Sequence, residues 1–179
     1  MLLTHPMLMD LVRSGIIQNV EDVHVNAASI DIRLGDSLLV EVGRPGIVDL
    51  AEREIPEMRP LDLDAMGAWR LRPGQFCLVN SHEVFNLPND IAAEFKLRSS
   101  VARAGIDHAL AGWADPGWHD ATLTMELRNV TQNHTLLLRP GMRIGQMVFW
   151  RGEPVSVRAS YATRGRYNHQ RSATESRGV

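Results

Sequence analysis

The chain has 179 residues, a formal net charge of −2 and one cysteine, Cys77. This length suits one well-buried domain rather than two. The small net charge gives no global basic field, which argues against long nucleic acid as a partner. One cysteine forms no internal disulfide or multi-cysteine metal site, and no apolar run reaches the roughly 18 residues that span a bilayer. We therefore expect a soluble, cytoplasmic protein without a membrane partner.

The first predicted element is a short helix that Thr4 caps and Gly15 ends. Its apolar residues fall on one face and are Leu8, Leu11 and Val12. Beyond this helix the apolar pattern has period two, most clearly in residues 29–34 and 122–127. Such alternation is typical of half-buried strands.

Turn signals separate the remaining apolar segments. They are Pro45-Gly46, Pro73-Gly74, Pro88-Asn89, Pro116-Gly117 and Pro140-Gly141. Many short strands between such turns favour an all-β sandwich or barrel with a few short helices over a βαβ fold. We expect residues 1–160 to form this β domain. Residues 161–179 form a tail, and its part at 164–177, rich in Gly, Ser and Arg, is a candidate for disorder.

Residues 98–105 predict a short helix with phosphate-binding potential. Ser99 is placed to cap it, with the helix beginning at Ser100, and Gly105 is placed to end it. A helix N-terminus offers unpaired N–H groups, and here two hydroxyls and Arg98 stand beside it. Arg103 follows Ser99 by four residues and so shares its face. An ordinary capped surface helix would have the same pattern.

Two carboxylates are candidates for chemistry. Glu126 lies on the polar face of its strand, whereas Leu123, Met125 and Leu127 point to the core. Glu126 is either a solvated strand glutamate or a catalytic group. A catalytic role requires that a neighbouring subunit or the tail covers the polar face of the strand. Asp115 opens an Asp-Pro-Gly turn that projects the aspartate into a cleft or simply reverses the chain.

Motifs for bound metal or for a phosphate loop are absent from the sequence. The seven histidines show no H-x-x-x-H spacing, and the H-x-E and P-C-x-x-C signature of zinc nucleobase deaminases is missing. Neither GxxxxGK nor GxGxxG occurs. We expect no protein-bound metal, zinc included.

Five ordered motifs and the tail resemble the dCTP deaminases, relatives of the trimeric dUTPases. They are NAASIDIRLG at 26–35, RSSVAR at 98–103, DPGW at 115–118, LTMELRN at 123–129, RPGMRIGQ at 139–146, and the closing segment from RYNHQ at 166–170 to 176–177. The resemblance implies a dUTPase-like distorted jelly-roll or β-clip barrel. It also implies a homotrimer with active sites between subunits, and zinc-free deamination of dCTP to dUTP and ammonia for dUTP supply.

The same resemblance implies roles for individual residues. Glu126 is the expected general base, and Ser99 and Arg103 are its expected catalytic partners, because water that attacks cytosine C4 needs a proton acceptor. The implied substrate-binding residues are Arg98, Ser99, Ser100 and Arg103 with the phosphates, Asp115 with the sugar, the main chain at Thr124 and Met125 with the base, and Tyr161, Arg166 and Gln170 closing from the tail. Mg²⁺ is expected to arrive with the triphosphate, and dTTP is a candidate inhibitor.

Alternatives remain at this point. A relative that also hydrolyses the triphosphate would release dUMP, and Ala111-Gly112-Trp113 resembles a stretch found in some bifunctional relatives. A plain dUTPase would not need Glu126 paired with Arg103. A catalytically silent nucleotide-binding regulatory module could use the same fold. The sequence favours the deaminase that stops at dUTP, since nothing in it positively supplies a second water site.

Overall fold

The computed structural model describes residues 1–178, so Val179 of the predicted tail lies outside the described residues. These residues form mostly strands with a few short helices, as the sequence predicts. The strands are β1 (Ile17–Gln18), β2 (Ile30–Glu41), β3 (Met58–Pro60), β4 (Trp69–Leu71), β5 (Phe76–Asn86), β6 (Ile91–Leu97), β7 (Ile106–His108), β8 (Trp113–Ala114), β9 (His119–Asn129), β10 (Leu136–Leu138) and β11 (Arg143–Arg151). The helices are α1 (His5–Arg13), η1 (Asp22–His24), η2 (Leu50–Glu52), α2 (Ser99–Arg103) and α3 (Tyr161–Arg164).

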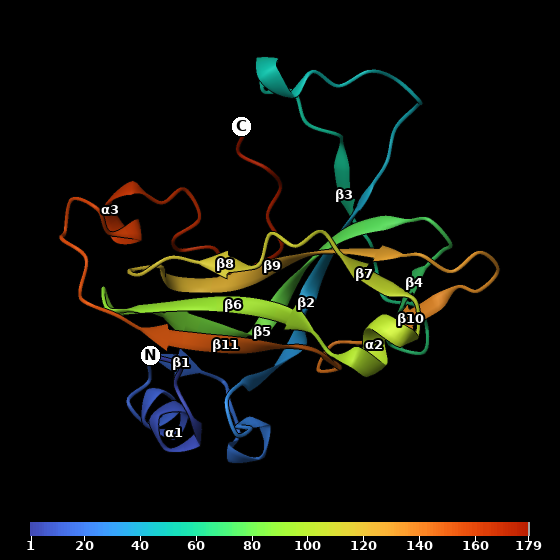
Figure 1. Ribbon diagram of the computed structural model, residues 1–179. Helices are drawn as coiled ribbons and strands as arrows, with labels where there is room; N and C mark the ends of the chain where they lie inside the picture. Colours follow the sequence, from blue (N-terminus) through green and yellow to red (C-terminus); the bar gives the residue numbers. More distant parts are fainter. Residues whose placement is uncertain (179) are drawn as a thin grey trace.

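One antiparallel sheet carries the fold and curls into an open half-barrel (Figure 1). Its main path is β7-β9-β5-β2-β11-β6-β8, with β1 added to β5 and β3 to β2, and β10 pairs with β4 in a separate ribbon. The long strand β9 pairs with β5 on one side and with the short β7 on the other. The end of β9 from Leu127 to Asn129 is therefore paired on both edges, and the N–H of Ala109, just after β7, donates to the Glu126 carbonyl at 3.1 Å. This part of the strand is a rigid platform for a site.

The core fills the inside of the curl. Its largest fully buried side chains include Trp69, Phe85 and Phe149. Along β9 the predicted alternation is confirmed: Met125 and Leu127 are buried, and Glu126 between them is partly exposed. Residues 29–34 differ from the half-buried expectation, because polar residues on the outer face of β2 are covered too. Asp31, for example, is 2% exposed beneath two arginines.

Both predicted helices are present, with one correction. Helix α1 follows Thr4 and ends before Gly15, which adopts φ +75°. In α2 the sequence assigned Ser99 as the cap, but Arg98 occupies the N-cap position with extended backbone and Ser99 is the first helical residue. Pairing of the main-chain N–H of Arg98 with the carbonyl of Ile144 on β11 holds that residue outside the helix. Gly105, at φ +95°, then turns the chain into β7.

The tail lies against the domain, which differs from the expected disorder of residues 164–177. Ser160 caps α3 by accepting the N–H of Ala162 at 3.2 Å. Further on, the main chains of Thr122 and Gln170 pair at 2.9 Å, and Gln170 is buried. The main-chain N–H of Thr174 also donates to Thr124 Oγ1 at 3.3 Å, so polar contacts with β9 hold the tail. None of the helices in the described part of the chain is long and apolar enough to cross a membrane.

Candidate active site

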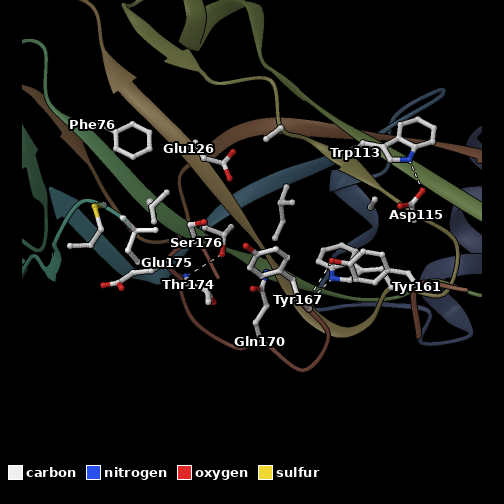
Figure 2. A pocket seen from close by; sticks show the side chains of 18 of the residues that line it. Phe76, Trp113, Asp115, Glu126, Tyr161, Tyr167, Gln170, Thr174, Glu175 and Ser176 are labelled. Atoms are coloured by element: carbon white, nitrogen blue, oxygen red, sulfur yellow. Dashed lines mark hydrogen bonds between the residues drawn. The ribbon is translucent and has the colours of Figure 1, made fainter. Parts of the chain in front are cut away.

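The tail and β9 enclose a cavity of about 430 Å³. Figure 2 shows Glu126, Asp115, Gln170 and both tyrosines around it. The sheet, the β8 segment, the loop before β3 and the tail all contribute. The lining residues are Ile55, Pro56, Met58, Phe76, Leu78, Ala111, Trp113, Ala114, Asp115, Trp118, Leu123, Thr124, Glu126, Tyr161, Tyr167, Gln170, Thr174, Glu175 and Ser176.

Glu126 sits in the middle of β9, where the register pairs it with Leu78 of β5. Strand alternation turns its side chain away from the core and into the cavity. One-quarter of the side chain is exposed, so water can reach the carboxylate although the tail covers it. The neighbouring Met125 side chain is fully buried on the other face, so only the main chain of Met125 is available for the predicted contact with a ligand.

Asp115 is fixed by the turn that the sequence predicted. The N–H of Trp118 pairs with the Asp115 carbonyl at 3.2 Å, and Gly117 takes φ +89° in a space that a Cβ would share with the Ser160 hydroxyl at 2.0 Å. The indole Nε1–H of Trp113 donates to Asp115 Oδ1 at 2.9 Å (Figure 2). Turn and indole together hold the carboxylate at the cavity wall.

The tail contributes polar side chains to the lining of the cavity. The Gln170 amide donates to the Thr122 carbonyl at 2.9 Å, and its own Oε1 is buried without a partner among the described residues. Tyr161 accepts the N–H of Tyr167 at 3.3 Å. Burial raises the pKa of the Tyr161 hydroxyl, which therefore keeps its proton at neutral pH and can donate it. Gln170 and Tyr161 thus offer an acceptor and a donor to a bound molecule.

A charged contact fastens the tail beside the cavity. His169 Nδ1 lies 2.9 Å from Asp120 Oδ2, and Arg171 also pairs with Asp120. The hydrogen bond to His169, and then the charge of Arg171, lower the pKa of Asp120. With a lowered pKa, the contribution of Asp120 to holding the tail is present above its ordinary pKa. It is lost as the pH falls through the lowered value.

The cavity is acidic. Its lining within residues 1–178 carries three carboxylates, Asp115, Glu126 and Glu175, and neither lysine nor arginine. Aromatic and aliphatic side chains make up most of the rest. Such a lining suits a flat neutral base and a sugar, but it repels a triphosphate. The cations that would hold phosphates must come from outside this cavity.

The residues predicted to hold phosphates lie elsewhere in the chain. Ser99, Ser100 and Arg103 are exposed on α2, and none of them lines the cavity of Glu126. Arg98 and Ser100 border a separate hollow of about 480 Å³. The buried carboxylate of Asp31 accepts a hydrogen bond from Arg98 Nη1 at 2.8 Å, which holds the guanidinium beside α2. Within one chain, the predicted trio of Glu126, Ser99 and Arg103 is not brought together.

Arg166 takes an intermediate position. It borders a hollow of about 620 Å³ next to the cavity, which shares Asp115, Tyr161 and Tyr167 with it. Its Nη1 donates to the Gly178 carbonyl at 2.8 Å. Of the residues predicted for the site, the structure therefore places Glu126, Asp115, Thr124, Tyr161 and Gln170 together, and Arg166 next to them.

Sequence reasoning missed His108. This residue ends β7, is 5% exposed, and brings Nε2 to 3.3 Å from Glu126 Oε2. The alternation of Ile106, Asp107 and His108 was the available signal, because it gives His108 the same inward face as Ile106. Pairing of β7 with β9 across the chain then brings the imidazole to Glu126, and no local pattern reveals that pairing.

The described residues contain neither a cluster of metal ligands nor a reactive thiol. Across the described chain, no group of three or more His, Cys, Asp or Glu side chains is placed to hold a metal ion. Burial raises the pKa of Cys77 to about 12, so this thiol is not a nucleophile at neutral pH.

Comparison with known proteins identifies relatives of this chain. A family model described as dCTP deaminase-like matches residues 2–152. A protein of Beutenbergia cavernae called "dCTP deaminase, dUMP-forming" is 37% identical over 161 residues, which cover 88% of this chain and 83% of that protein. A protein of Methanosphaerula palustris with the same name is 33% identical over 180 residues, which cover 99% of this chain and 95% of that protein.

A solved structure of a dCTP deaminase has a similar fold. The 2′-deoxycytidine 5′-triphosphate deaminase from Agrobacterium tumefaciens superposes with a TM-score of 0.64 at 23% identity, over 84% of this chain. The match covers 48% of that solved chain, so this chain spans about half its length. The predicted dUTPase-like fold is confirmed. By the family model and the two relatives, this chain belongs to the dCTP deaminase-like family.

Proposed function

We propose that this protein deaminates dCTP and carries the product on to dUMP. The observation that carries the proposal is a cavity for a base and a sugar with Glu126 at its wall, in a chain whose relatives are named as dUMP-forming dCTP deaminases. Those names favour the bifunctional alternative over the sequence-based expectation that the reaction stops at dUTP. Asp115, held by Trp113, is available for a second step.

In the first step Glu126 acts as the general base. It takes a proton from water as the water oxygen bonds to cytosine C4, and it returns the proton to the ring or to the amino group. The C4–N bond then breaks and ammonia leaves, so that dCTP and water yield dUTP. A carboxylate suits this role because it accepts the proton, holds it and gives it back within one site.

In the second step water attacks the α-phosphorus and pyrophosphate leaves, so that dUTP and water yield dUMP. This water needs its own position, in line with the leaving oxygen, and its own proton acceptor. Asp115 is our candidate acceptor, because it stands at the cavity wall next to the hollow of Arg166. Tyr161 borders both spaces, and its hydroxyl can donate to a phosphate oxygen.

We infer that the complete site forms between copies of the chain in a homotrimer. The described residues that line the cavity include three carboxylates and no cation, whereas Ser99, Ser100 and Arg103 lie exposed on α2. A neighbouring α2 placed at the mouth of the cavity would bring Arg103 to Glu126 and Arg98 to the phosphates. This arrangement supplies the positive charge that the cavity lacks.

The proposal is tested by following dCTP with Mg²⁺ through a time course, with ammonia, dUTP, dUMP and pyrophosphate all measured. We expect ammonia, and dUMP that appears with pyrophosphate without a lag in which dUTP accumulates. Accumulation of dUTP would support deamination of dCTP and contradict the proposed hydrolysis of dUTP to dUMP. Nucleotide binding without ammonia would leave only a regulatory module.

Metal analysis gives a further prediction. We propose that Mg²⁺ is held mainly by the phosphate oxygens and water, which neutralises the triphosphate, and that zinc takes no part, since the chain lacks zinc-ligand motifs. Active protein should contain well under one zinc per chain, and a zinc-selective chelator with Mg²⁺ in excess should leave the rate unchanged. Stoichiometric zinc that follows activity would contradict the proposed chemistry.

A further inference from the structure

We propose that His108 is a positioning residue for Glu126: its neutral imidazole donates Nε2–H to Glu126 Oε2 and fixes which carboxylate oxygen faces the reacting water. The inference rests on the proposed role of Glu126 in deamination. His108 itself does not touch the space for the substrate, since it is not among the residues that line the cavity.

Two buried polar atoms without hydrogen-bond partners among the described residues face each other beside the cavity. His108 Nε2 and Glu126 Oε2 are both inaccessible to solvent, and neither has a hydrogen-bond partner among the described residues. They are 3.3 Å apart. Leaving either atom unpaired would cost free energy. Catalytic hydrogen bonds are often long before substrate binds and shorten afterwards, so this contact fits a bond that completes in the loaded site.

The tautomer of His108 follows from its contact with Leu110. The main-chain N–H of Leu110 donates to His108 Nδ1 at 3.1 Å, so Nδ1 is an acceptor and carries no proton. A neutral imidazole protonates one nitrogen, and the proton must therefore sit on Nε2, the atom that faces Glu126. A second proton would have to enter on Nδ1 and would displace the Leu110 N–H. The backbone thus selects the donor form.

The surroundings of His108 hold its imidazole ring in place. The Phe95 ring of β6 meets the imidazole edge-on, with centroids 4.9 Å apart. Leu110 adopts φ +62°, a backbone conformation that costs free energy for a residue with a side chain. In this conformation its main-chain N–H donates to His108 Nδ1. Asp107 Oδ1 accepts the main-chain N–H of His108 at 2.9 Å, and Glu126 Oε2 lies 3.3 Å from the imidazole Nε2. Glu126 is the one aligned with Nε2.

The consequence for the reaction is geometric. With Oε2 engaged by His108, the carboxylate cannot rotate freely, and Oε1 remains free for water. A base held in one orientation meets the water at the productive angle in each turnover. Loss of the contact should lower kcat and leave KM nearly unchanged, because the base and sugar contacts of the nucleotide are elsewhere.

Two conservative substitutions separate this role from mere packing. In His108→Gln the amide nitrogen can occupy the place of Nε2 and still donate to Glu126. In His108→Asn the amide can replace only Nδ1 and its bond with Leu110. We expect kcat for deamination to fall by about 10- to 100-fold in His108→Asn, the loss of a hydrogen bond to a charged group, and by only several-fold in His108→Gln. KM should change little in both.

A measurement that does not depend on turnover completes the test. Long-range proton–nitrogen NMR of the full-length protein should show His108 as the neutral Nε2–H tautomer, with the Nε2 signal shifted by Glu126→Gln and unshifted by Glu175→Gln, a matched cavity carboxylate. Protonation on Nδ1, or equal kcat losses in both His108 variants that follow their melting temperatures, would overturn the inference. A correct tautomer in a protein that releases no ammonia from dCTP would instead show that the proposed function failed.

Discussion

Replacing Glu126 with Gln should reduce deamination of dCTP by at least about 10²-fold, the loss expected when a general base is removed. The amide keeps the size of the side chain but accepts no proton. Because Glu126 sits on a strand that is paired along both edges, the fold should stay intact, and the melting temperature and dCTP binding should change little. Single-turnover rates, a dCTP binding isotherm and a melting curve check the three parts. Near-normal turnover would remove Glu126 from the mechanism.

The same variant tests whether the site is shared between subunits. Glu126→Gln and Arg103→Ala should each be inactive alone, since one lacks the base and the other lacks the cation proposed to come from a neighbour. If the two are unfolded together and refolded in equal amounts, about a quarter of the sites combine an intact Glu126 with an intact Arg103 from the adjacent copy. Activity should return to roughly that fraction. A double variant mixed with itself is the control, and no recovery in the mixture would place the site within one chain.

Removing residues 164–179 should lower turnover by about 10²-fold, the scale of loss when positioning groups are taken away. The truncation deletes Tyr167, Gln170 and three other residues of the cavity wall, so water enters freely and the nucleotide loses its cover. The core should survive, because Ala173 is the one buried apolar residue among the described residues of this segment. Initial rates and light scattering would show a folded assembly with poor activity.

Point variants distinguish residues of the tail that line the cavity from residues that only hold the tail against the domain. Gln170→Ala removes a side chain that lines the cavity, whereas His169→Ala removes an exposed side chain that contacts Asp120 outside it. The first should affect turnover more than the second. A truncated protein that works as well as the full chain would show that the tail is not a lid.

The sequence predicted what depends on local pattern. The period-two alternation around Met125 placed Glu126 on the open face of a strand, and the Pro-Gly turn after Asp115 placed that aspartate at a cavity wall. Both follow from backbone geometry over a few residues. The cap of α2 was wrong by one residue because a tertiary bond from Arg98 to β11, and not the preference of Ser99, decides where the helix begins.

Other features depend on pairing between distant segments. His108 reaches Glu126 because β7 pairs with β9, and Asp31 reaches Arg98 across 67 residues. The order of the tail likewise depends on the β9 surface that receives Gln170, which its composition does not show. Such contacts are set by topology, and no alternation or spacing within one segment encodes them.

Phe95, which meets the His108 ring edge-on, also covers Gly145 on β11. A Cβ at position 145 would lie 2.1 Å from the Phe95 ring, so the ring occupies space that is available only because that glycine has no side chain. Any larger residue there would push Phe95, and Phe95 would in turn displace the imidazole. A substitution at Gly145, which lies on another strand and does not line the cavity, is therefore expected to lower the rate of deamination. Mutating only the residues that contact the nucleotide would not reveal this effect.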